Sequence, residues 1–257
     1  MKKKEKNVLV IDIGNSYTKF ALFNINDEIF FSFSYPTKII STKNNFLFQI
    51  LKQKLKSINI DSIILGSVVP KLNSFFIKTF KEKLLLTPHV INKKTKFIFK
   101  LSSDMKLNEI GNDILAFATY CAFKNKNVIG FSFGTALVAI LINNNVLKGV
   151  SIVSGLKTSL DALVDKTALI NIKNLELSKN FDYGHDTLTA LNSGIYHFKN
   201  GFMSSFYNMA LKTIKSNELL IILTGFEASN SELNFKYVID KNAILIGYYL
   251  IHKTNNW

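Results

Sequence analysis

The stretch that decides the fold lies near the N-terminus and reads VLVIDIGNSYTKFALF (residues 8–23). A short apolar run carries one carboxylate, Asp12, near its end, just before Gly14 and two small polar residues. A second, half-apolar run follows. Two short apolar runs on either side of a glycine turn are typical of a β-hairpin. We therefore predict strand, tight turn and strand, with a carboxylate at the end of the first strand.

A second segment of the chain has the same pattern. Residues 127–144, NVIGFSFGTALVAILINN, align without gaps with residues 7–24, NVLVIDIGNSYTKFALFN, at a spacing of 120 residues. The glycine of the turn recurs as Gly134, and Ser132 stands where the first copy has Asp12. An internal repeat of this length predicts a duplicated domain rather than a solenoid.

Strand-like and helical segments alternate after each hairpin, and no low-complexity linker separates the two halves. This order predicts an α/β fold with a mixed sheet in each half. We expect an N-terminal domain at residues 1–125 and a C-terminal domain at residues 126–257, packed around a cleft. The two hairpins would then face each other across that cleft.

Composition narrows the class of protein. Of the 257 residues, 47% are hydrophobic and 19% charged, which is enough apolar material for a sizeable core. The single cysteine excludes an internal disulfide. No apolar run reaches the roughly 18–20 residues that span a bilayer, and the basic N-terminus lacks the cleavage pattern of a signal peptide. We expect a cytoplasmic protein with no membrane partner.

The net charge of +14 does not by itself indicate a nucleic-acid partner. Every one of the 32 basic residues is lysine, and the chain has no arginine. Nucleic-acid binders normally use arginine for bidentate contacts with phosphates and guanines. Abundant Lys, Asn, Ile and Phe are typical of AT-rich coding, so we predict no nucleic-acid function.

Two such hairpins indicate phosphate chemistry. Glycine turns let backbone N–H groups approach a ligand closely, and a run of such groups forms an anion nest. Ser16 and Thr135 add hydroxyl donors, and Asp12 can hold Mg²⁺ directly or through waters. The expected chemistry is phosphoryl transfer from ATP. The alternative is an ordinary strand that ends in a turn.

At this point the chain resembles a known family, the bacterial type III pantothenate kinases. The motifs DIGNSYTK, GND before a helix, FGTA, SG after the second hairpin, DTLTALNSGI and LTG occur in that family's order, from about Val8 to Leu250. The resemblance implies two duplicated ribonuclease H-like domains with the actin-like ATPase fold, and a homodimer. It also implies transfer of the ATP γ-phosphate to pantothenate, the first step of coenzyme A synthesis. Mg²⁺ and a monovalent cation, K⁺ or NH₄⁺, are the implied cofactors.

Carried over residue by residue, the resemblance assigns three groups of positions. The ATP-binding residues are Asp12, Ile13, Gly14, Asn15, Ser16, Tyr17, Thr18, Lys19 and Thr135, with Asp12 also the expected Mg²⁺ ligand. The substrate-binding residues are Gly111, Asn112, Asp113, Ile114 and Thr187, with Asp113 as the general base. Ser132 occupies the position of a monovalent-cation ligand.

The residues themselves support part of this assignment. Asp113 precedes an apolar helical pattern, and a helix N-terminus attracts an anion that can accept a hydroxyl proton. A plain first-turn acid is the alternative for Asp113. Thr187 has the alternative of a helix N-cap role beside Asp186.

The chain departs from the family pattern at two important positions. Ile114 stands where the family has an arginine, and Ser132 where it has an aspartate. These departures motivate the hypothesis of a non-catalytic homologue that binds nucleotide or a partner. A third hypothesis is a different kinase or phosphatase of the same superfamily.

Overall fold

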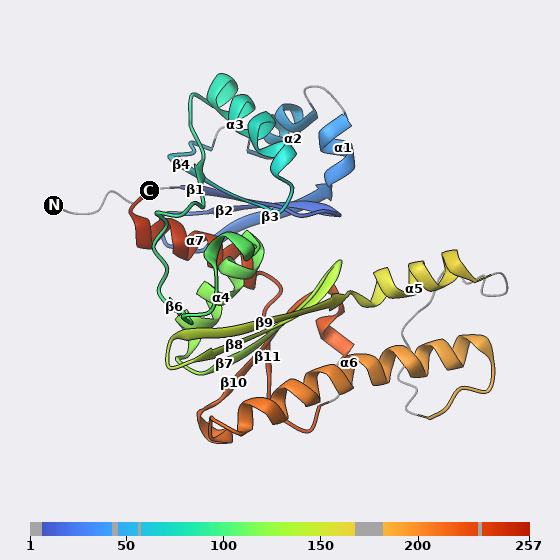
Figure 1. Cartoon of the computed structure of the whole chain (residues 1–257). Coiled ribbons are helices and arrows are strands. Elements are labelled where there is room, and N and C mark those ends of the chain that lie inside the picture. The colour runs from blue at the N-terminus through green and yellow to red at the C-terminus, as the bar shows by residue number, and fades with distance from the viewer. Residues whose placement is uncertain (1–6, 43–45, 56–57, 168–181, 231–232) are drawn as a thin grey trace. The chain divides into compact units, whose positions relative to one another are not determined.

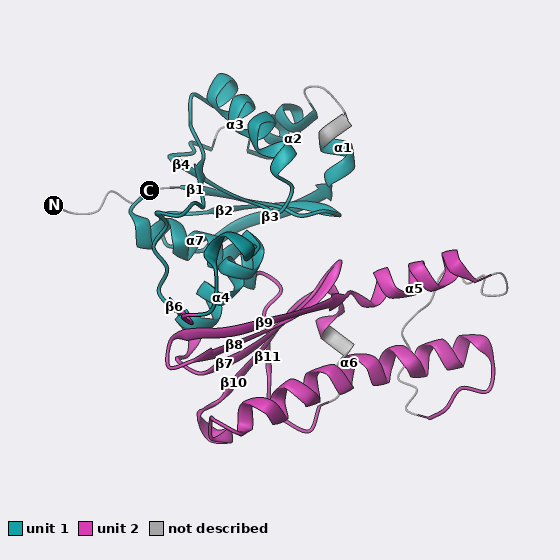
Figure 2. Cartoon of the chain, viewed as in Figure 1, with its two compact units in different colours: residues 1–100, 104–123, 243–257 teal, residues 101–103, 124–242 magenta. Residues whose placement is uncertain are grey.

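The computed structural model describes residues 7–42, 46–55, 58–167, 182–230 and 233–257 (Figure 1). The chain divides into two compact units, which Figure 2 colours separately. Unit 1 comprises residues 1–100, 104–123 and 243–257, and unit 2 comprises residues 101–103 and 124–242.

The sheet of unit 1 has five strands in the order β3-β2-β1-β4-β5. β1 is antiparallel to β2 and parallel to β4, which is in turn parallel to β5. Every residue of β1 and β4 is buried, which explains why these two central strands are almost continuously apolar. The strands are β1 (Val8–Ile13), β2 (Tyr17–Phe23), β3 (Ile29–Pro36), β4 (Ser62–Ser67) and β5 (His89–Val90).

Helices cover both faces of this sheet, with α1, α2 and α3 on one side and α4 and α7 on the other (Figure 1). Leu9, Ile11 and Ile13 pack with the first three helices in one core cluster. Alternation along the strand turns Asp12 toward the opposite side, where α7 lies against β1 and β4. The helices are α1 (Thr37–Thr42), α2 (Phe46–Leu55), α3 (Pro70–Leu84), α4 (Asn112–Lys124) and α7 (Ala243–Asn255), with a 3₁₀ turn at Leu107–Glu109.

The sheet of unit 2 repeats this arrangement. Its order is β11-β10-β7-β8-β9-β6, so β9-β8-β7-β10-β11 corresponds to β3-β2-β1-β4-β5. The parallel and antiparallel pairings also correspond. The predicted duplication of a ribonuclease H-like α/β domain is confirmed. The strands are β6 (Lys100–Leu101), β7 (Val128–Phe133), β8 (Ala136–Asn143), β9 (Val146–Ser154), β10 (Leu220–Gly225) and β11 (Val238–Ile239).

One long helix covers a face of the second sheet. Ile129, Phe131 and Phe133 of β7 form a core cluster with Met203 and Ala210 of α6. Ser132 therefore lies on the face of β7 that is turned away from α6. The helices of this unit are α5 (Leu156–Lys166) and α6 (Thr187–Leu211), with 3₁₀ turns at Ser216–Glu218 and Phe226–Asn230.

The structure corrects the ungapped alignment of the two hairpins. Ile13 pairs with Thr18 in the first hairpin, whereas Phe133 pairs with Leu137 in the second. The spacing of 120 residues therefore holds for the first strand of each hairpin and changes to 119 in the second strand. The second turn is one residue shorter, because Gly134 N–H bonds to the carbonyl oxygen two residues ahead rather than three.

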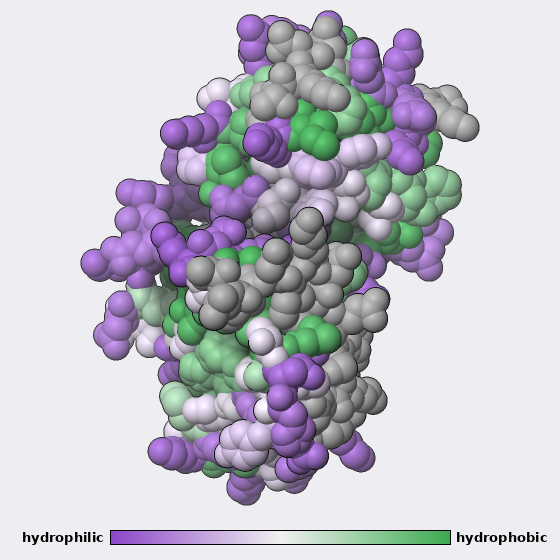
Figure 3. All heavy atoms as spheres, turned by 90° about the vertical axis from the view of Figure 1, so that its right-hand side faces the viewer, coloured by the Kyte–Doolittle hydropathy of each residue, from purple (hydrophilic) through white to green (hydrophobic). Residues whose placement is uncertain are grey.

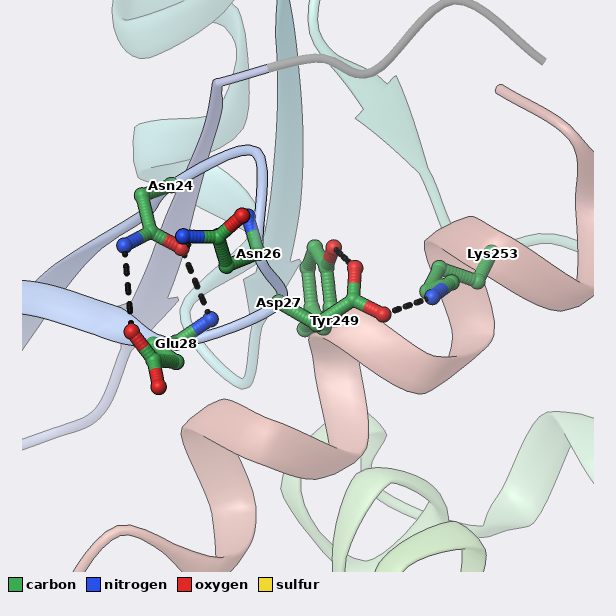
Figure 4. A network of polar contacts seen from close by, with 6 residues as sticks. All are labelled: Asn24, Asn26, Asp27, Glu28, Tyr249 and Lys253. Carbon is green, nitrogen blue, oxygen red and sulfur yellow. Dashed lines mark hydrogen bonds and ion pairs between the residues drawn. The ribbon is translucent and has the colours of Figure 1, made fainter. Parts of the chain in front are cut away.

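The units differ from the predicted division at residues 125 and 126 in the placement of the last helix. α7 belongs to unit 1, where Tyr249 stacks on Phe23 with ring centroids 4.1 Å apart. Figure 4 shows Tyr249 and Lys253 pointing at Asp27, whose two carboxylate oxygens accept their hydrogen bonds. The same close-up shows Asn24 bonded to Asn26 and Glu28, which closes the β2–β3 turn.

Two features bear on partners. Within the described ranges no helix is both long and apolar enough to cross a membrane. Figure 3 shows hydrophilic residues in several separate places on the drawn face, with hydrophobic residues between them.

Candidate functional site

The first hairpin divides into a buried frame and an exposed turn. Ile13 and Thr18, which pair across the hairpin, are both fully buried. The Thr18 hydroxyl lies 3.0 Å from that of Thr37, which donates to the carbonyl oxygen of Gly14 at 2.7 Å. These side chains hold the turn in shape and do not reach solvent. Asn15, Ser16 and Tyr17 form its exposed tip.

Gly14 is required by the geometry of that turn. Its N–H donates to the carbonyl oxygen of Tyr17 at 3.0 Å. A Cβ at position 14 would lie only 2.8 Å from the same oxygen, closer than real Cβ contacts come. The glycine in DIGNS is therefore set by the tight turn, as the sequence predicted.

Asp12 is buried, with 5% of its surface exposed, on the α4 and α7 side of the sheet. Its register neighbours are Lys19 on β2 and Gly66 on β4. Burial raises the pKa of Asp12 to about 6; the charge of Lys19 opposes this rise and the carboxylate of Asp113 adds to it. A buried carboxylate in this state favours a cation close by.

Asp113 stands at the start of α4, as predicted. Its Oδ1 accepts the backbone N–H of Ile114 at 2.9 Å. A Cβ at position 111 would lie 2.6 Å from that oxygen, so Gly111 makes room for the carboxylate. Burial raises the pKa of Asp113, while backbone N–H groups and the charge of Lys19 oppose the rise. Asp12, Asp113 and Lys19 therefore lie within electrostatic range of one another.

The remaining positions of the GND motif are structural in this unit. Asn112 donates from its side-chain amide to the carbonyl oxygen of Ser67 at 3.2 Å, which attaches the start of α4 to the end of β4. Ile114 is buried, with 9% of its surface exposed. Its side chain supplies no charge to a ligand.

Tyr248 completes this group and was not identified from the sequence. It is fully buried on α7, and its hydroxyl lies 3.5 Å from Oδ1 of Asp12. A Cβ at Gly66 would lie 2.0 Å from the Tyr248 ring, so the ring crosses the β4 glycine beside Asp12. A tyrosine within an apolar helical pattern is typical of a core residue, and no local signal distinguishes this one.

The residues present fit Mg²⁺. Mg²⁺ usually takes one or two protein carboxylates and completes its shell with waters and substrate phosphates. Asp12 and Asp113 are two such carboxylates close to each other, and their mutual repulsion contributes to the raised pKa of Asp12. No cluster of three or more potential His, Cys, Asp or Glu ligands exists among the described residues. The donor set therefore suits a metal shared with substrate phosphates rather than an all-protein site.

The second hairpin has an exposed turn that is anchored from below. The carbonyl oxygen of Thr135 accepts the Gly155 N–H and the Thr158 hydroxyl, each at 2.9 Å. A Cβ at position 155 would lie 2.0 Å from the Gly134 carbonyl oxygen, so Gly155 permits this close packing. The turn that carries Thr135 is thereby held against the start of α5.

Ser132 lacks the partners that the cation site of the resemblance requires. Its register neighbours are Val138 on β8 and Thr224 on β10. None of these three positions carries a carboxylate, so they offer K⁺ or NH₄⁺ no negative charge. The aspartate that the resemblance implies as a ligand is therefore absent, and these positions offer neutral oxygens only.

A buried lysine near the second hairpin was also missed by sequence reasoning. Lys199 of α6 is 3% exposed, and its Nζ lies 5.0 Å from the ring centroid of Phe133. It donates to the backbone carbonyl oxygen of Glu227. Burial lowers the pKa of Lys199 to about 8, against the charge of Glu227. The Glu227 carboxylate accepts the Lys157 backbone N–H, so it caps the start of α5.

Thr187 is the first residue of α6 and is exposed. The helix is capped by Asp186 and Thr189 in a reciprocal capping box. The Thr187 hydroxyl is therefore not needed as a cap.

Comparisons with known proteins identify the family of this chain. A family model described as type III pantothenate kinase matches residues 8–209. A protein named type III pantothenate kinase from Malacoplasma penetrans is 38% identical, and the match covers 100% of both chains. A protein of the same name from Mycoplasmopsis synoviae is 31% identical over 99% of this chain and 100% of its own.

Solved structures support the fold alone. A chain from Campylobacter jejuni, described as a conserved Baf family transcriptional activator, has a TM-score of 0.59 at 19% identity, covering 96% of this chain and 98% of that one. The activator of 2-hydroxyisocaproyl-CoA dehydratase from Clostridium difficile, with bound ADPNP, has a TM-score of 0.52 at 13% identity, covering 97% and 96%. With the family match over most of its length, the chain belongs to the type III pantothenate kinase family.

Proposed function

We propose that this chain transfers the γ-phosphoryl group of ATP to the primary hydroxyl of pantothenate and so forms 4′-phosphopantothenate for coenzyme A synthesis. Family membership supports the substrates. The observation that carries the chemistry is the pair of carboxylates, the buried Asp12 and the half-buried Asp113, beside Lys19 at the first glycine hairpin. Phosphoryl transfer depends mainly on positioning and on neutralising charge.

The hairpin turns are the proposed phosphate contacts. In unit 1, the exposed tip of Asn15, Ser16 and Tyr17 offers backbone N–H groups and a hydroxyl to an anion. In unit 2, the exposed Thr135 offers its hydroxyl. Ile13 and Thr18, also predicted as ATP-binding, would act through the backbone, because their side chains are buried.

Asp113 is the proposed general base. Burial raises its pKa, which makes the carboxylate a stronger proton acceptor than an exposed aspartate. As the hydroxyl oxygen of pantothenate bonds to the γ-phosphorus, the bond to the β–γ bridging oxygen breaks and ADP leaves. The hydroxyl proton goes to Asp113. Asp12 would hold Mg²⁺, which neutralises charge on the phosphates when bound.

The pantothenate site is proposed from the GND motif and Thr187. Gly111 and Asn112 shape the approach to Asp113, and the Thr187 hydroxyl is available because Asp186 caps the helix. Ile114 is buried and uncharged, so the substrate carboxylate must be recognised by another group. We propose Mg²⁺ as cofactor, with K⁺ or NH₄⁺ stimulating only weakly because Ser132 is neutral.

We also propose a homodimer in the cytoplasm, from the family resemblance. One surface feature supports an interface: Phe198 and Met209 on α6 are 42% and 56% exposed. They stand eleven residues apart, so they share one face of the helix. Light scattering on the purified protein should give a mass near twice 29.1 kDa. A monomer at micromolar concentration would contradict this part of the proposal.

The kinase assay is direct. Purified protein with Mg²⁺·ATP and pantothenate should form 4′-phosphopantothenate and ADP in equal amounts, in buffers containing Na⁺, K⁺ or NH₄⁺. ADP release without phosphopantothenate would favour another acceptor, which a panel of small alcohols and sugars would identify. Nucleotide binding by calorimetry without any turnover would favour the non-catalytic hypothesis, which Ile114 and Ser132 motivate.

A further inference from the structure

Two adjacent tyrosines on α7 use their hydroxyls in different places. Tyr248 is fully buried and its hydroxyl lies 3.5 Å from Asp12 Oδ1. Tyr249 is also buried, with 5% of its surface exposed, but its hydroxyl donates to Asp27 in the β2–β3 turn (Figure 4). The contact of Tyr249 with Asp27 helps to attach α7 to the sheet. The contact of Tyr248 is with Asp12, the carboxylate that we assign to Mg²⁺.

The Tyr248 hydroxyl is not explained by packing. A phenylalanine would fill the same space against Gly66 and would carry no polar atom into the core. A buried hydroxyl is unfavourable unless a hydrogen bond compensates its lost hydration. Within the described part of the chain, the hydrogen bond of this hydroxyl is the one with Asp12. The hydrogen bond with the Asp12 carboxylate therefore explains why this position has a tyrosine hydroxyl.

We propose that Tyr248 is a positioning residue that holds the Asp12 carboxylate in the orientation required for binding a divalent cation. This inference rests on the proposed function, in which Asp12 is the Mg²⁺ ligand. A phenol hydroxyl has one proton and donates it to Oδ1, which leaves Oδ2 for the cation or its water shell.

Gly66 and Tyr248 fit together beside Asp12. Gly66 is the register neighbour of Asp12 on β4, and its missing side chain leaves the space that the tyrosine ring occupies. The ring enters from α7, which is more than 230 residues from Asp12 in the chain. The corresponding β10 position in unit 2, Thr224, has a side chain, and its β7 neighbour is Ser132 rather than an aspartate. The glycine is thus found only where the aspartate is.

The test compares Tyr248→Phe with the matched control Tyr249→Phe. Each variant removes one hydroxyl from adjacent residues of the same helix. The probe is Mn²⁺ alone, followed by electron paramagnetic resonance of the free ion in the full-length protein. Tyr248→Phe should weaken Mn²⁺ binding about three- to tenfold. Tyr249→Phe should lower the melting temperature and leave Mn²⁺ binding as in the wild type.

A kinetic measurement accompanies the binding measurement. In Tyr248→Phe, the Mg²⁺ concentration at half-maximal rate should rise by the same factor, and the rate at saturating Mg²⁺ should stay within about twofold of the wild type. A merely structural role would lower the rate at all Mg²⁺ concentrations and would not move the Mn²⁺ affinity. Asp12→Asn should bind Mn²⁺ weakly, and adding Tyr248→Phe to it should change nothing further.

The outcomes separate the two ideas. Wild-type binding of Mn²⁺ by Tyr248→Phe, or equal losses in both variants, would overturn the positioning role. If the wild type fails to phosphorylate pantothenate and Tyr248→Phe still binds Mn²⁺ more weakly, the proposed function fails and the positioning role stands. If Tyr248→Phe does not fold, Gly66→Ala replaces it: the added Cβ displaces the ring, and unchanged Mn²⁺ affinity in that variant overturns the proposal.

Discussion

The two glycine hairpins have the same strand order and pairing but differ in the polar residues at the end of the first strand. In unit 1 this position is Asp12, next to Lys19 on the neighbouring strand. In unit 2 it is Ser132, next to Val138. The second copy has neither the aspartate nor the lysine at these positions, although its corresponding strands have the same order. The fold does not need this charge pair.

The difference between the two copies bears on where the proposed chemistry takes place. A buried carboxylate destabilises the folded state unless a cation or hydrogen bond compensates it. In unit 1, Lys19 and the Tyr248 hydroxyl lie beside Asp12, whose pKa is raised by burial. Burying this carboxylate opposes folding, and the strand could form without it. Unit 2 keeps only the exposed glycine turn with Thr135. The comparison therefore supports the proposal that unit 1 carries the metal and proton chemistry and that the second hairpin contributes phosphate contact alone.

The largest effect is expected at Asp113. Asp113→Asn removes the proton acceptor and keeps the shape, so kcat should fall about 10²–10⁴-fold. The measurement is phosphopantothenate formation at saturating substrates, with the melting temperature as a control for folding. A variant that keeps more than a tenth of the wild-type rate would show that Asp113 is only a first-turn acid.

Asp12 and Ser132 test the comparison directly. Asp12→Asn should lower kcat/KM at least about 100-fold, because the amide cannot replace the carboxylate at the metal. Ser132→Ala, the matched change in the second copy, should alter it less than about fivefold. Steady-state kinetics at several Mg²⁺ concentrations would measure both. Equal losses in the two variants would break the proposed division of labour.

The pH dependence of stability should differ between wild type and Asp12→Asn. The pKa of Asp12 is about 6 when folded and 3.8 as the ordinary value. The folded state therefore binds this proton more tightly, and protonation stabilises it. The wild type should gain about 2 kcal/mol relative to Asp12→Asn as pH falls from 7 to 4. Urea unfolding of both proteins at four pH values checks this; a constant difference across the range would contradict it.

The two turn glycines should respond unequally to alanine. A Cβ at position 14 would lie 2.8 Å from the Tyr17 carbonyl oxygen, whereas one at position 134 would lie 3.8 Å from that of Ala136. Gly14→Ala should lower the free energy of unfolding by about 1–3 kcal/mol. Gly134→Ala should change it by less than about 1 kcal/mol, in the stabilising direction. Denaturant titration measures both, and similar losses would show that the two turns are under the same constraint.

The smallest effect is expected from restoring the acid in the second copy. Ser132→Asp supplies the carboxylate that the family pattern has at this position, so K⁺ or NH₄⁺ should stimulate this variant a few-fold more than the wild type, relative to Na⁺. The rates in the three salts at equal ionic strength provide the measurement. Strong K⁺ stimulation of the wild type itself would show that another group replaces the missing carboxylate.

Much of the site followed from local patterns. The apolar run before Gly14 and the alternation after it predict the first hairpin, and the structure contains it. Asp113 precedes an apolar helical period, and α4 begins one residue before it. The extra residue in the first turn could not be predicted from the sequence. It is defined by the hydrogen bond from the Gly14 N–H to the Tyr17 carbonyl oxygen, which exists only once the turn has formed.

The helices, the strands and the internal repeat could be predicted from the sequence, because strand, helix and turn preferences act between near neighbours in the chain. The tertiary structure alone decided what surrounds Asp12. Tyr248 comes from the last helix and Gly66 from a parallel strand. Within unit 2, the tertiary structure likewise decided the burial of Lys199 beside Phe133. In the sequence these are a core tyrosine, a strand glycine and a helical lysine. Their roles come from burial and proximity across long stretches of chain, which raise or lower pKa values only once the chain has folded.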